Sequence, residues 1–323
     1  MRAIERVNKK IRLNRDSPIP ERGGGEFLIR VLSAGICGTD LEIRKGYMGF
    51  EGIPGHEFVG RVVEDGGEGM VGARVVSEIN CGCGKCDYCL ASMRRHCPAR
   101  TVIGISGRPG AFADYIVVPA ENVHRIPDVY SDLLAVLVEP FAAALKAVED
   151  GDLSNGHRLV ILGDGRLGIM VSLAARLEGY HPLLLGKHPE KLAFAERAGV
   201  EVRLWNGSFR TSWRGAFDRV FDCTGNPEGI GIALDLVKPM GRVVMKTTIS
   251  RESQFPLASL VINEVELVGS RCGDFTCAIP LMGKVSDILQ QMITAVYDLE
   301  AWEGAFQRAA DPDSLKVIFH MAE

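Results

Sequence analysis

Near its middle the chain reads Arg158-Leu-Val-Ile-Leu-Gly-Asp-Gly-Arg-Leu-Gly168, and this stretch decides the fold of the residues around it. Residues 158–162 predict a short buried strand because they end in an unbroken apolar run, and residues 169–177 predict a helix. The glycines between them allow a tight turn, close approach of the backbone to a pyrophosphate, and close packing of helix on strand. The pattern predicts a dinucleotide-binding βαβ unit that contacts its cofactor through Gly163, Gly165, Arg166, Leu167 and Gly168.

The choice of dinucleotide depends on the residues after the second strand, which is expected at 182–185. An acid about 20 residues after the turn binds the ribose 2′-hydroxyl of NAD, whereas basic groups favour the 2′-phosphate of NADP. Here Gly186 leaves room, Lys187 supplies positive charge and His188 follows, with no acid before Glu190. We therefore expect NADP. NAD remains the alternative if Lys187 is a solvated loop residue and Glu190 reaches back.

Further strands are expected at 219–221, 242–245 and 265–268, and the carboxyl ends of such parallel strands line the cofactor crevice. Arg271 and Cys272 follow the last strand and either face the nicotinamide or lie in a loop. The tail predicts helices at 280–299 and 300–310 and a closing strand at 315–319, which returns to the first domain. Beyond the glycine turn and Lys187 and His188, the expected cofactor contacts are Cys223, Thr224, Gly225 and Arg271.

Residues 1–125 have a different texture, with alternating runs at 27–32, 57–63, 73–79 and 111–119 broken by glycines. This spacing predicts an all-β unit with little helix. Between the third and fourth runs the cysteines are spaced as four ligands of one closed tetrahedral zinc site. Free surface thiols are the alternative, and Cys81 and His96 receive no role. The expected structural zinc ligands are Cys83, Cys86, Cys89 and Cys97.

A second set of metal donors flanks residues 35–57. Cys37 follows the first alternating run among glycines, and His56 opens the second. Each residue alone is more often a small buried side chain or a satisfied polar group than a ligand. Two strand ends that meet in space, however, present sulfur and nitrogen to one zinc ion. Asp40 is placed to accept from the far nitrogen of His56 and so to fix its tautomer.

Composition bounds the function further. The chain has 323 residues, 46% apolar and 24% charged, with a net charge of −4, so nothing points to nucleic acid or an acidic membrane surface. No apolar run approaches the length of a membrane span, and the first residues do not read as a signal peptide. Clustered cysteines in such a chain indicate reduced thiols on metal, so we expect a cytoplasmic protein.

These motifs together resemble the zinc-containing medium-chain dehydrogenase/reductase family, over about residues 27–319. The resemblance rests on Gly35-Ile-Cys-Gly-Thr-Asp40, Gly55-His-Glu57, the cysteine lobe, Val138-Glu-Pro140 and the glycine turn. It implies an α/β plus β fold, in which a GroES-like β-barrel catalytic domain is interrupted by a Rossmann nucleotide-binding domain, with the active site in the cleft between them. The expected domains are residues 1–139, 140–275 and 276–323, where the last returns to the catalytic domain.

The resemblance also assigns roles at the catalytic metal. It implies two zinc ions per chain, one structural and one catalytic, the latter held by Cys37, His56 and Glu139. Glutamate as third ligand resembles the polyol, sugar and threonine dehydrogenase branches, whereas alcohol dehydrogenases typically have cysteine there. Glu57 resembles the acid behind the zinc, and Thr39 the hydroxyl that passes on the substrate proton. Glu42 replaces the histidine often found further along this proton path.

We therefore expect a zinc-dependent oxidoreductase that transfers hydride between a secondary alcohol, such as a polyol or sugar, and NADP(H). By family analogy it is a homodimer or homotetramer. A primary alcohol dehydrogenase working as an aldehyde reductase is one alternative. A non-catalytic NADP-binding redox sensor with purely structural zinc is another, against which the intact set of Cys37, Thr39, His56 and Glu139 argues.

Overall fold

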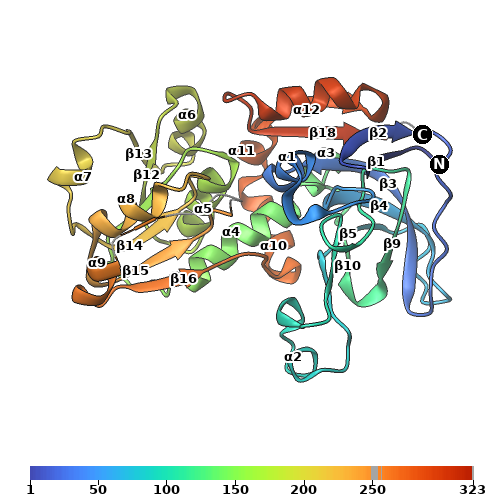
Figure 1. The fold of residues 1–323 in the computed structure, drawn as a ribbon, viewed down its shortest axis with the longest axis horizontal. Helices are drawn as coiled ribbons and strands as arrows, with labels where there is room; N and C mark the ends of the chain where they lie inside the picture. Colours follow the sequence, from blue (N-terminus) through green and yellow to red (C-terminus); the bar gives the residue numbers. More distant parts are fainter. Residues whose placement is uncertain (249–253, 256, 322–323) are drawn as a thin grey trace. The chain divides into compact units, whose positions relative to one another are not determined.

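The computed structural model describes residues 1–248, 254–255 and 257–321. The chain forms two compact units, each built around one large sheet (Figure 1). The first unit contains Met1–Glu139 and Ile293–Glu323, and the second contains Pro140–Met292. The tail thus returns to the first unit, after Met292 rather than after residue 275.

The first unit is built around a seven-stranded sheet in the order β10-β5-β4-β3-β18-β17, with β9 paired to β3. Its long strand β3 pairs antiparallel with β4 on one edge and with β9 and then β18 on the other. Shifts of register along the β3–β4 pair bend the strand, which lets the sheet curl as in a barrel. The strands expected at 27–32, 57–63, 73–79, 111–119 and 315–319 are confirmed, the fourth in shortened form. The observed bounds are β3 (Glu26–Ile36), β4 (Glu57–Glu64), β5 (Arg74–Ser77), β9 (Tyr115–Pro119), β10 (Val123–Arg125), β17 (Ile293–Asp298) and β18 (Lys316–His320).

Smaller elements surround this sheet. The hairpin of β1 and β2, which the sequence did not predict, pairs antiparallel at the start of the chain. The cysteine-rich lobe around α2 projects away from the strands of its unit (Figure 1). The elements are β1 (Ala3–Val7), β2 (Lys10–Asn14), α1 (Gly38–Lys45), η1 (Tyr47–Gly49), β6 (Asn80–Cys81), α2 (Asp87–Leu90), η2 (Arg94–His96), β7 (Thr101–Ile103), β8 (Gly107–Arg108), η3 (Ala120–Asn122), α3 (Asp132–Ala135), η5 (Leu299–Ala301) and α12 (Trp302–Ala310).

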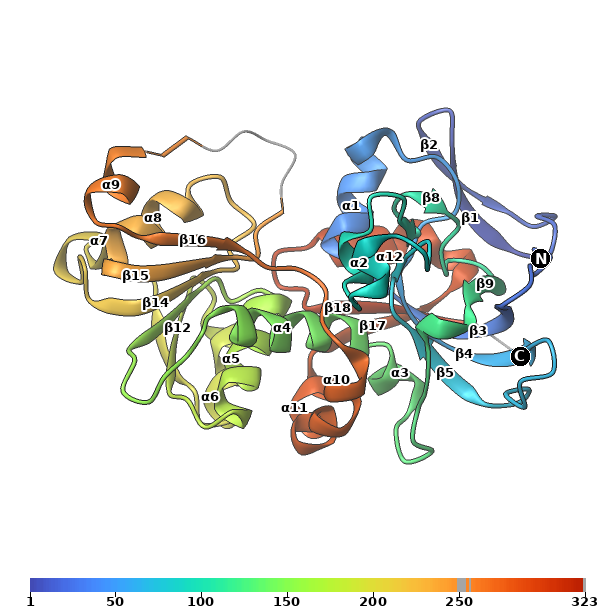
Figure 2. The same ribbon diagram turned by 90° about the horizontal axis from the view of Figure 1, so that it is seen from below.

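The second unit contains a six-stranded parallel sheet in the order β13-β12-β11-β14-β15-β16. Helices α4, α5 and α6 lie on one face and α8 and α9 on the other (Figure 2), as in the predicted Rossmann fold. Its strands are β11 (Leu159–Leu162), β12 (Pro182–Gly186), β13 (Glu201–Leu204), β14 (Phe217–Asp222), β15 (Val237–Met245) and β16 (Glu266–Gly269). Its helices are α4 (Val138–Asp150), which begins two residues before the unit, α5 (Arg166–Leu177), α6 (Pro189–Arg197), α7 (Phe209–Ser212), α8 (Gly229–Leu236), α9 (Leu257–Ile262), α10 (Phe275–Met282), η4 (Gly283–Val285) and α11 (Ser286–Gln291).

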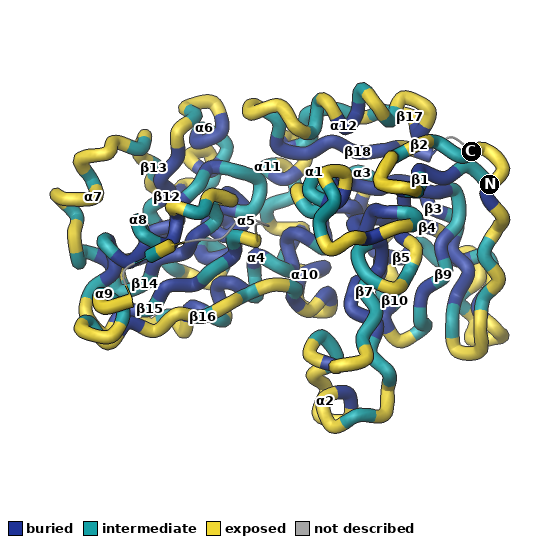
Figure 3. Tube along the Cα trace, viewed as in Figure 1, coloured by how far each residue is buried: buried dark blue, intermediate teal, exposed yellow. Residues whose placement is uncertain are grey.

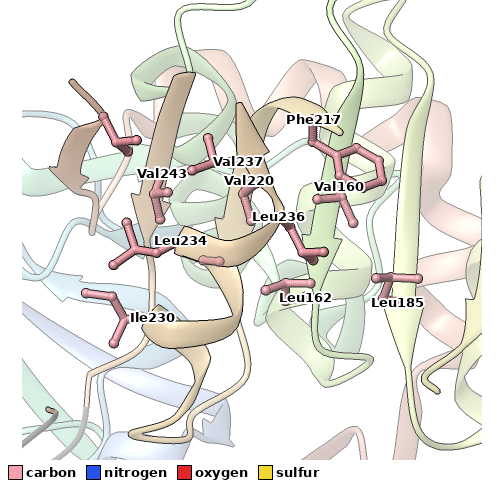
Figure 4. Close-up of a cluster of buried hydrophobic side chains, with 12 residues drawn as sticks. Val160, Leu162, Leu185, Phe217, Val220, Ile230, Leu234, Leu236, Val237 and Val243 are labelled. Carbon is pink, nitrogen blue, oxygen red and sulfur yellow. The ribbon is translucent and has the colours of Figure 1, made fainter. Parts of the chain in front are cut away.

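The core of the second unit explains why its central strands are apolar throughout. Val160 and Leu162 of β11 pack with Val220 of β14, Val243 of β15 and Leu234 of α8 (Figure 4). Both faces of a central parallel strand are covered, so all four residues of β11 are buried. In Figure 3 these strands are mostly dark, whereas exposed segments are concentrated in the connecting loops.

The predicted helix at 280–299 is wrong in its second half. Residues 293–298 form strand β17, which pairs in parallel with β18. Two short helices precede it, and they belong to the second unit, since Phe275 and Met282 of α10 are buried there. Gly273 lies so close to Ala142 that an added Cβ would overlap its carbonyl group, which ties this segment to α4. The helix expected at 300–310 is confirmed as α12.

Candidate metal centre and nucleotide pocket

Cys37 lies where β3 gives way to helix α1, at the position that caps the helix. Helix α1 follows the strand directly, and Asp40 lies in its first turn. Its Oδ2 accepts a hydrogen bond from the backbone N–H of Cys37 at 2.8 Å, as an acid in the first turn of a helix does. The Oδ1 of the same carboxylate accepts from the N–H of Gly55 at 3.2 Å. Asp40 therefore ties the two segments that carry the metal donors.

His56 stands directly before β4 and is 3% exposed. Its Nδ1 lies 3.4 Å from the Oδ1 of Asp40, which is itself fully buried. Burial alone would lower the pKa of His56, but Asp40 and the neighbouring Cys37 raise it well above its usual value. The imidazole thus faces an anionic environment that favours a cation beside it.

Three donor atoms converge at this place. The sulfur of Cys37, a ring nitrogen of His56 and a carboxylate oxygen of Glu57 all lie within 4.8 Å of one another. Sulfur, nitrogen and oxygen donors at this spacing fit zinc. Glu139, in the first turn of α4, is outside this set within the described part of the chain. The hydroxyl of Thr39 lies 3.9 Å from the Cys37 sulfur.

Sequence reasoning missed Lys316, which lies on β18 and is fully buried. Its ammonium forms an ion pair with the carboxylate of Glu57 and donates to the carbonyl of Ile36 at 3.3 Å. Burial lowers the pKa of Lys316 to about 8, although the negative charges of Cys37 and Asp40 act to raise it. Gly35 leaves the room for this side chain, since an added Cβ would lie 2.5 Å from the lysine Cε. The available signal was a lysine within an otherwise apolar strand.

The cysteine lobe brings together the four thiols that the spacing predicted. The sulfurs of Cys83, Cys86, Cys89 and Cys97 lie within 4.8 Å of one another. Cys86 and Cys89 are 3.6 Å apart, close to the ~3.8 Å edge of a tetrahedron with Zn–S bonds near 2.3 Å. Backbone N–H groups of Lys85 and Cys86 lower the pKa of Cys83 to about 6, which favours the thiolate that binds zinc. This donor set fits a closed zinc site.

In the second unit the glycine turn has the predicted strand–turn–helix context. Gly163 follows β11 with φ 106°, a left-handed conformation that favours glycine. Gly165 caps α5, whose first residues are Arg166 and Leu167. An added Cβ on Gly168 would overlap the carbonyl oxygen of Gly163, so helix and turn pack at a distance that only glycine allows.

A cavity of about 170 Å³ opens beside this turn. It includes four of the predicted cofactor residues, and Lys187 is exposed at its rim. Seven predicted cofactor contacts are not among the described residues that line it: Gly165, Arg166, Leu167, Gly168, Cys223, Gly225 and Arg271. Burial raises the pKa of Cys223 to about 12. The residues that line the cavity include Gly163, Asp164, Gly186, Lys187, His188, Thr224 and Glu228.

Within the described residues, none of the helices has both the length and the apolar character needed to cross a bilayer.

Comparison with known proteins identifies the family. Residues 23–128 match the alcohol dehydrogenase GroES-like domain, and residues 167–286 match the zinc-binding dehydrogenase domain. D-arabitol-phosphate dehydrogenase of Enterococcus avium is 30% identical over 94% of this chain and 92% of its own. L-threonine 3-dehydrogenase of Streptomyces avermitilis is 33% identical over 94% of each. The structure of a zinc-binding dehydrogenase from Sinorhizobium meliloti 1021 bound to NADP is 26% identical, covers 99% of this chain and 98% of that chain, and has a TM-score of 0.86.

The chain therefore belongs to the zinc-containing medium-chain dehydrogenase/reductase family, in the branch of polyol and threonine dehydrogenases. It is an oxidoreductase that depends on zinc and on a nicotinamide cofactor. The predicted family and fold class are confirmed.

Proposed function

We propose that the enzyme oxidises a secondary alcohol of polyol or sugar type, or reduces the corresponding ketone, with NADP(H) as the preferred cofactor. The convergence of Cys37 and His56, held by the single carboxylate of Asp40, carries the proposal. The substrates named for the two relatives, an arabitol phosphate and threonine, both contain a secondary hydroxyl, which supports this substrate class.

For the catalytic zinc we propose Cys37, His56 and Glu139 as ligands. Glu57 is nearer to the first two, but its carboxylate is already paired with Lys316 and is therefore the acid behind the metal. A zinc ion with three protein ligands has an open position and acts there as a Lewis acid that lowers the pKa of a bound hydroxyl. The second zinc belongs to the cysteine lobe, which gives two ions per chain.

Thr39 receives the substrate proton in this proposal. Its hydroxyl lies beside the Cys37 sulfur, so it is near any group bound to the same metal. Asp40 holds the His56 ring and is not itself a proton acceptor from the substrate. Glu42, which replaces the family's histidine further along α1, forms an ion pair with Lys45 at 2.8 Å, and we assign no residue beyond Thr39 to the proton path.

The preference for NADP(H) is supported by the rim of the nucleotide cavity. Lys187 is exposed there, directly after a strand that ends in glycine rather than in an acid. An ammonium at this place attracts a 2′-phosphate. Replacing Lys187 by alanine is expected to raise KM for NADP without changing KM for NAD. An unchanged ratio of the two KM values would remove the phosphate-binding role of this lysine.

We also propose that the enzyme is a homo-oligomer. Strand β16 is an edge of the six-stranded sheet; one exposed apolar side chain lies on it, and three lie on α9, which precedes it in the chain. An exposed sheet edge with apolar side chains favours pairing with another chain. Light scattering after size exclusion tests this, with a monomer contradicting it. The apolar residues concerned are Leu257, Val261, Ile262 and Leu267.

The proposed location is the cytoplasm, because the four-thiolate site requires reduced cysteines.

Neither alternative function is favoured by the relatives, which are named as dehydrogenases of polyols and of threonine. The test is the zinc content per chain together with turnover on secondary alcohols, sugars, polyols and primary alcohols. Two zinc ions and turnover on a secondary alcohol are expected. Two zinc ions without turnover on any of these substrates would favour the redox sensor. Faster turnover on primary alcohols than on secondary alcohols would favour the aldehyde reductase.

A further inference from the structure

The nucleotide cavity contains a buried carboxylate to which the glycine-turn pattern assigns no role. Asp164 lies within the turn and is 6% exposed. Its Oδ2 accepts hydrogen bonds from the backbone N–H groups of Lys187 and His188, both at 2.6 Å. The turn is thereby joined to the residues that directly follow β12, where the cofactor preference is decided.

Gly186 occupies the strand end at which an acid would bind the ribose of NAD. An added Cβ there would overlap the Cβ of Asp164 and lie 2.5 Å from its Oδ2. The space that a side chain at 186 would fill is therefore taken by the Asp164 carboxylate. A glycine at 186 is required by this carboxylate, whatever the cofactor, so it does not by itself indicate room for a phosphate.

The two oxygens of Asp164 are used unequally. Oδ2 accepts both backbone hydrogen bonds, whereas the ring Nδ1 of His188 lies 3.1 Å from each oxygen. An ionised carboxylate accepts about four hydrogen bonds. Oδ1 therefore keeps capacity for a further donor, and Asp164 lines the cavity in which a ribose hydroxyl would supply one.

We propose that Asp164 supplies, from the turn, the ribose-binding carboxylate that the strand end lacks, so that the cavity accepts NAD(H) as well as NADP(H). This rests on the proposed function, since it concerns the same cofactor site. The 2′-hydroxyl of NAD(H) donates to Asp164, and the 2′-phosphate of NADP(H) is attracted by Lys187. Because its negative charge opposes a 2′-phosphate, Asp164 limits the preference for NADP(H).

The test is calorimetric binding of NAD⁺ and of NADP⁺ to the zinc-loaded full chain without substrate. Asp164→Asn keeps an oxygen for the two backbone N–H groups and removes the charge. We expect the Kd of NAD⁺ to rise about tenfold, as for the loss of a hydrogen bond to a charged group, while the Kd of NADP⁺ stays equal or falls. A Kd ratio of NAD⁺ to NADP⁺ that fails to rise overturns the proposal.

Glu228→Gln is the matched control, because Glu228 is an exposed acid that lines the same cavity. Its ratio is expected to change by less than about twofold, as for an ordinary surface substitution. An equal change in both variants would mean that any charge at the cavity acts alike, which overturns the specific role of Asp164.

A second variant moves the carboxylate back to the strand end. In Asp164→Gly/Gly186→Asp the overlap is removed, and the folded protein is expected to bind NAD⁺ about as tightly as the wild type. Loss of NAD⁺ binding in this variant overturns the proposal even if Asp164→Asn does not fold. A wild type that binds neither nucleotide contradicts the proposed function itself, whereas NADP⁺ binding with an unchanged ratio contradicts only the role of Asp164.

Discussion

Lys316 positions a carboxylate of the metal site without being a metal ligand itself. Its stem crosses the space above Gly35, and its ammonium ends against Glu57. Both partners are fully buried, so neither charge is solvated by water. A buried charge is tolerated only when it is paired. The lysine therefore fixes the carboxylate behind Cys37 and His56, on which the proposed ligand assignment depends.

We predict that Lys316→Met destabilises the enzyme by about 3–5 kcal/mol, because it leaves the Glu57 carboxylate buried without its partner. The measurement is urea unfolding followed by circular dichroism. The control is Lys316→Met/Glu57→Gln, in which both charges are removed and most of the stability is expected to return. Equal stability of the single variant and the wild type would show that the pair does not stabilise the fold.

At the scale of the element, the strand–turn–helix unit gives a matched pair of glycines. Gly168 faces the carbonyl oxygen of Gly163, whereas no heavy atom lies within 4 Å of an added Cβ on Gly165. Gly168→Ala forces the helix off the turn and is expected to cost roughly 1–3 kcal/mol by overpacking. Gly165→Ala is expected to leave stability unchanged.

The two variants separate folding from cofactor binding. Gly165 caps α5, where a pyrophosphate would approach the backbone, so Gly165→Ala is expected to weaken NADP⁺ binding in a protein of normal stability. Thermal unfolding and calorimetric titration on the same samples measure the two effects. Normal stability of Gly168→Ala would contradict the close packing of helix and turn. Normal NADP⁺ affinity of Gly165→Ala would contradict the proposed position of the pyrophosphate.

The cysteine lobe is expected to depend on its metal for structure, since it is a loop with short helical turns outside the main sheet. Cys89→Ser should therefore lower the melting temperature and make the lobe sensitive to proteases. Cys277→Ser is the control, because Cys277 is an exposed thiol on α10. If Cys89→Ser melted at the temperature of the wild type with the lobe still protected, the closed zinc site would be contradicted.

The sequence pattern predicted correctly those elements whose local residue preferences agree with their packing in the folded protein. Leu159–Leu162 is apolar throughout because both faces are covered, and the glycines after it admit few other structures. The prediction of a helix at Ile293–Asp298 was wrong because these residues suit either a helix or a strand. Only the pairing with β18 determines that the segment is a strand. Helix α1 was missed because Asp40 caps it from within the metal motif.

At the scale of the whole molecule, the limits of prediction follow from distance along the chain. The spacing of Cys83, Cys86, Cys89 and Cys97 is local, and the structure brings their sulfurs together as expected. The partners that complete the sites are remote in sequence: Lys316 reaches Glu57 from the other end of the chain, and Asp164 reaches the residues after β12. A pattern of spacing cannot predict such contacts, because they arise only when strands pair.

Cys37 and His56 are expected to hold a zinc ion that the reaction requires. The most direct measurement is the zinc content per chain and the turnover of the wild type and of Cys37→Ala, each checked by thermal unfolding. Two zinc ions are expected in the wild type, and one in a folded Cys37→Ala protein that no longer turns over. A Cys37→Ala protein with two zinc ions and normal turnover would contradict this expectation.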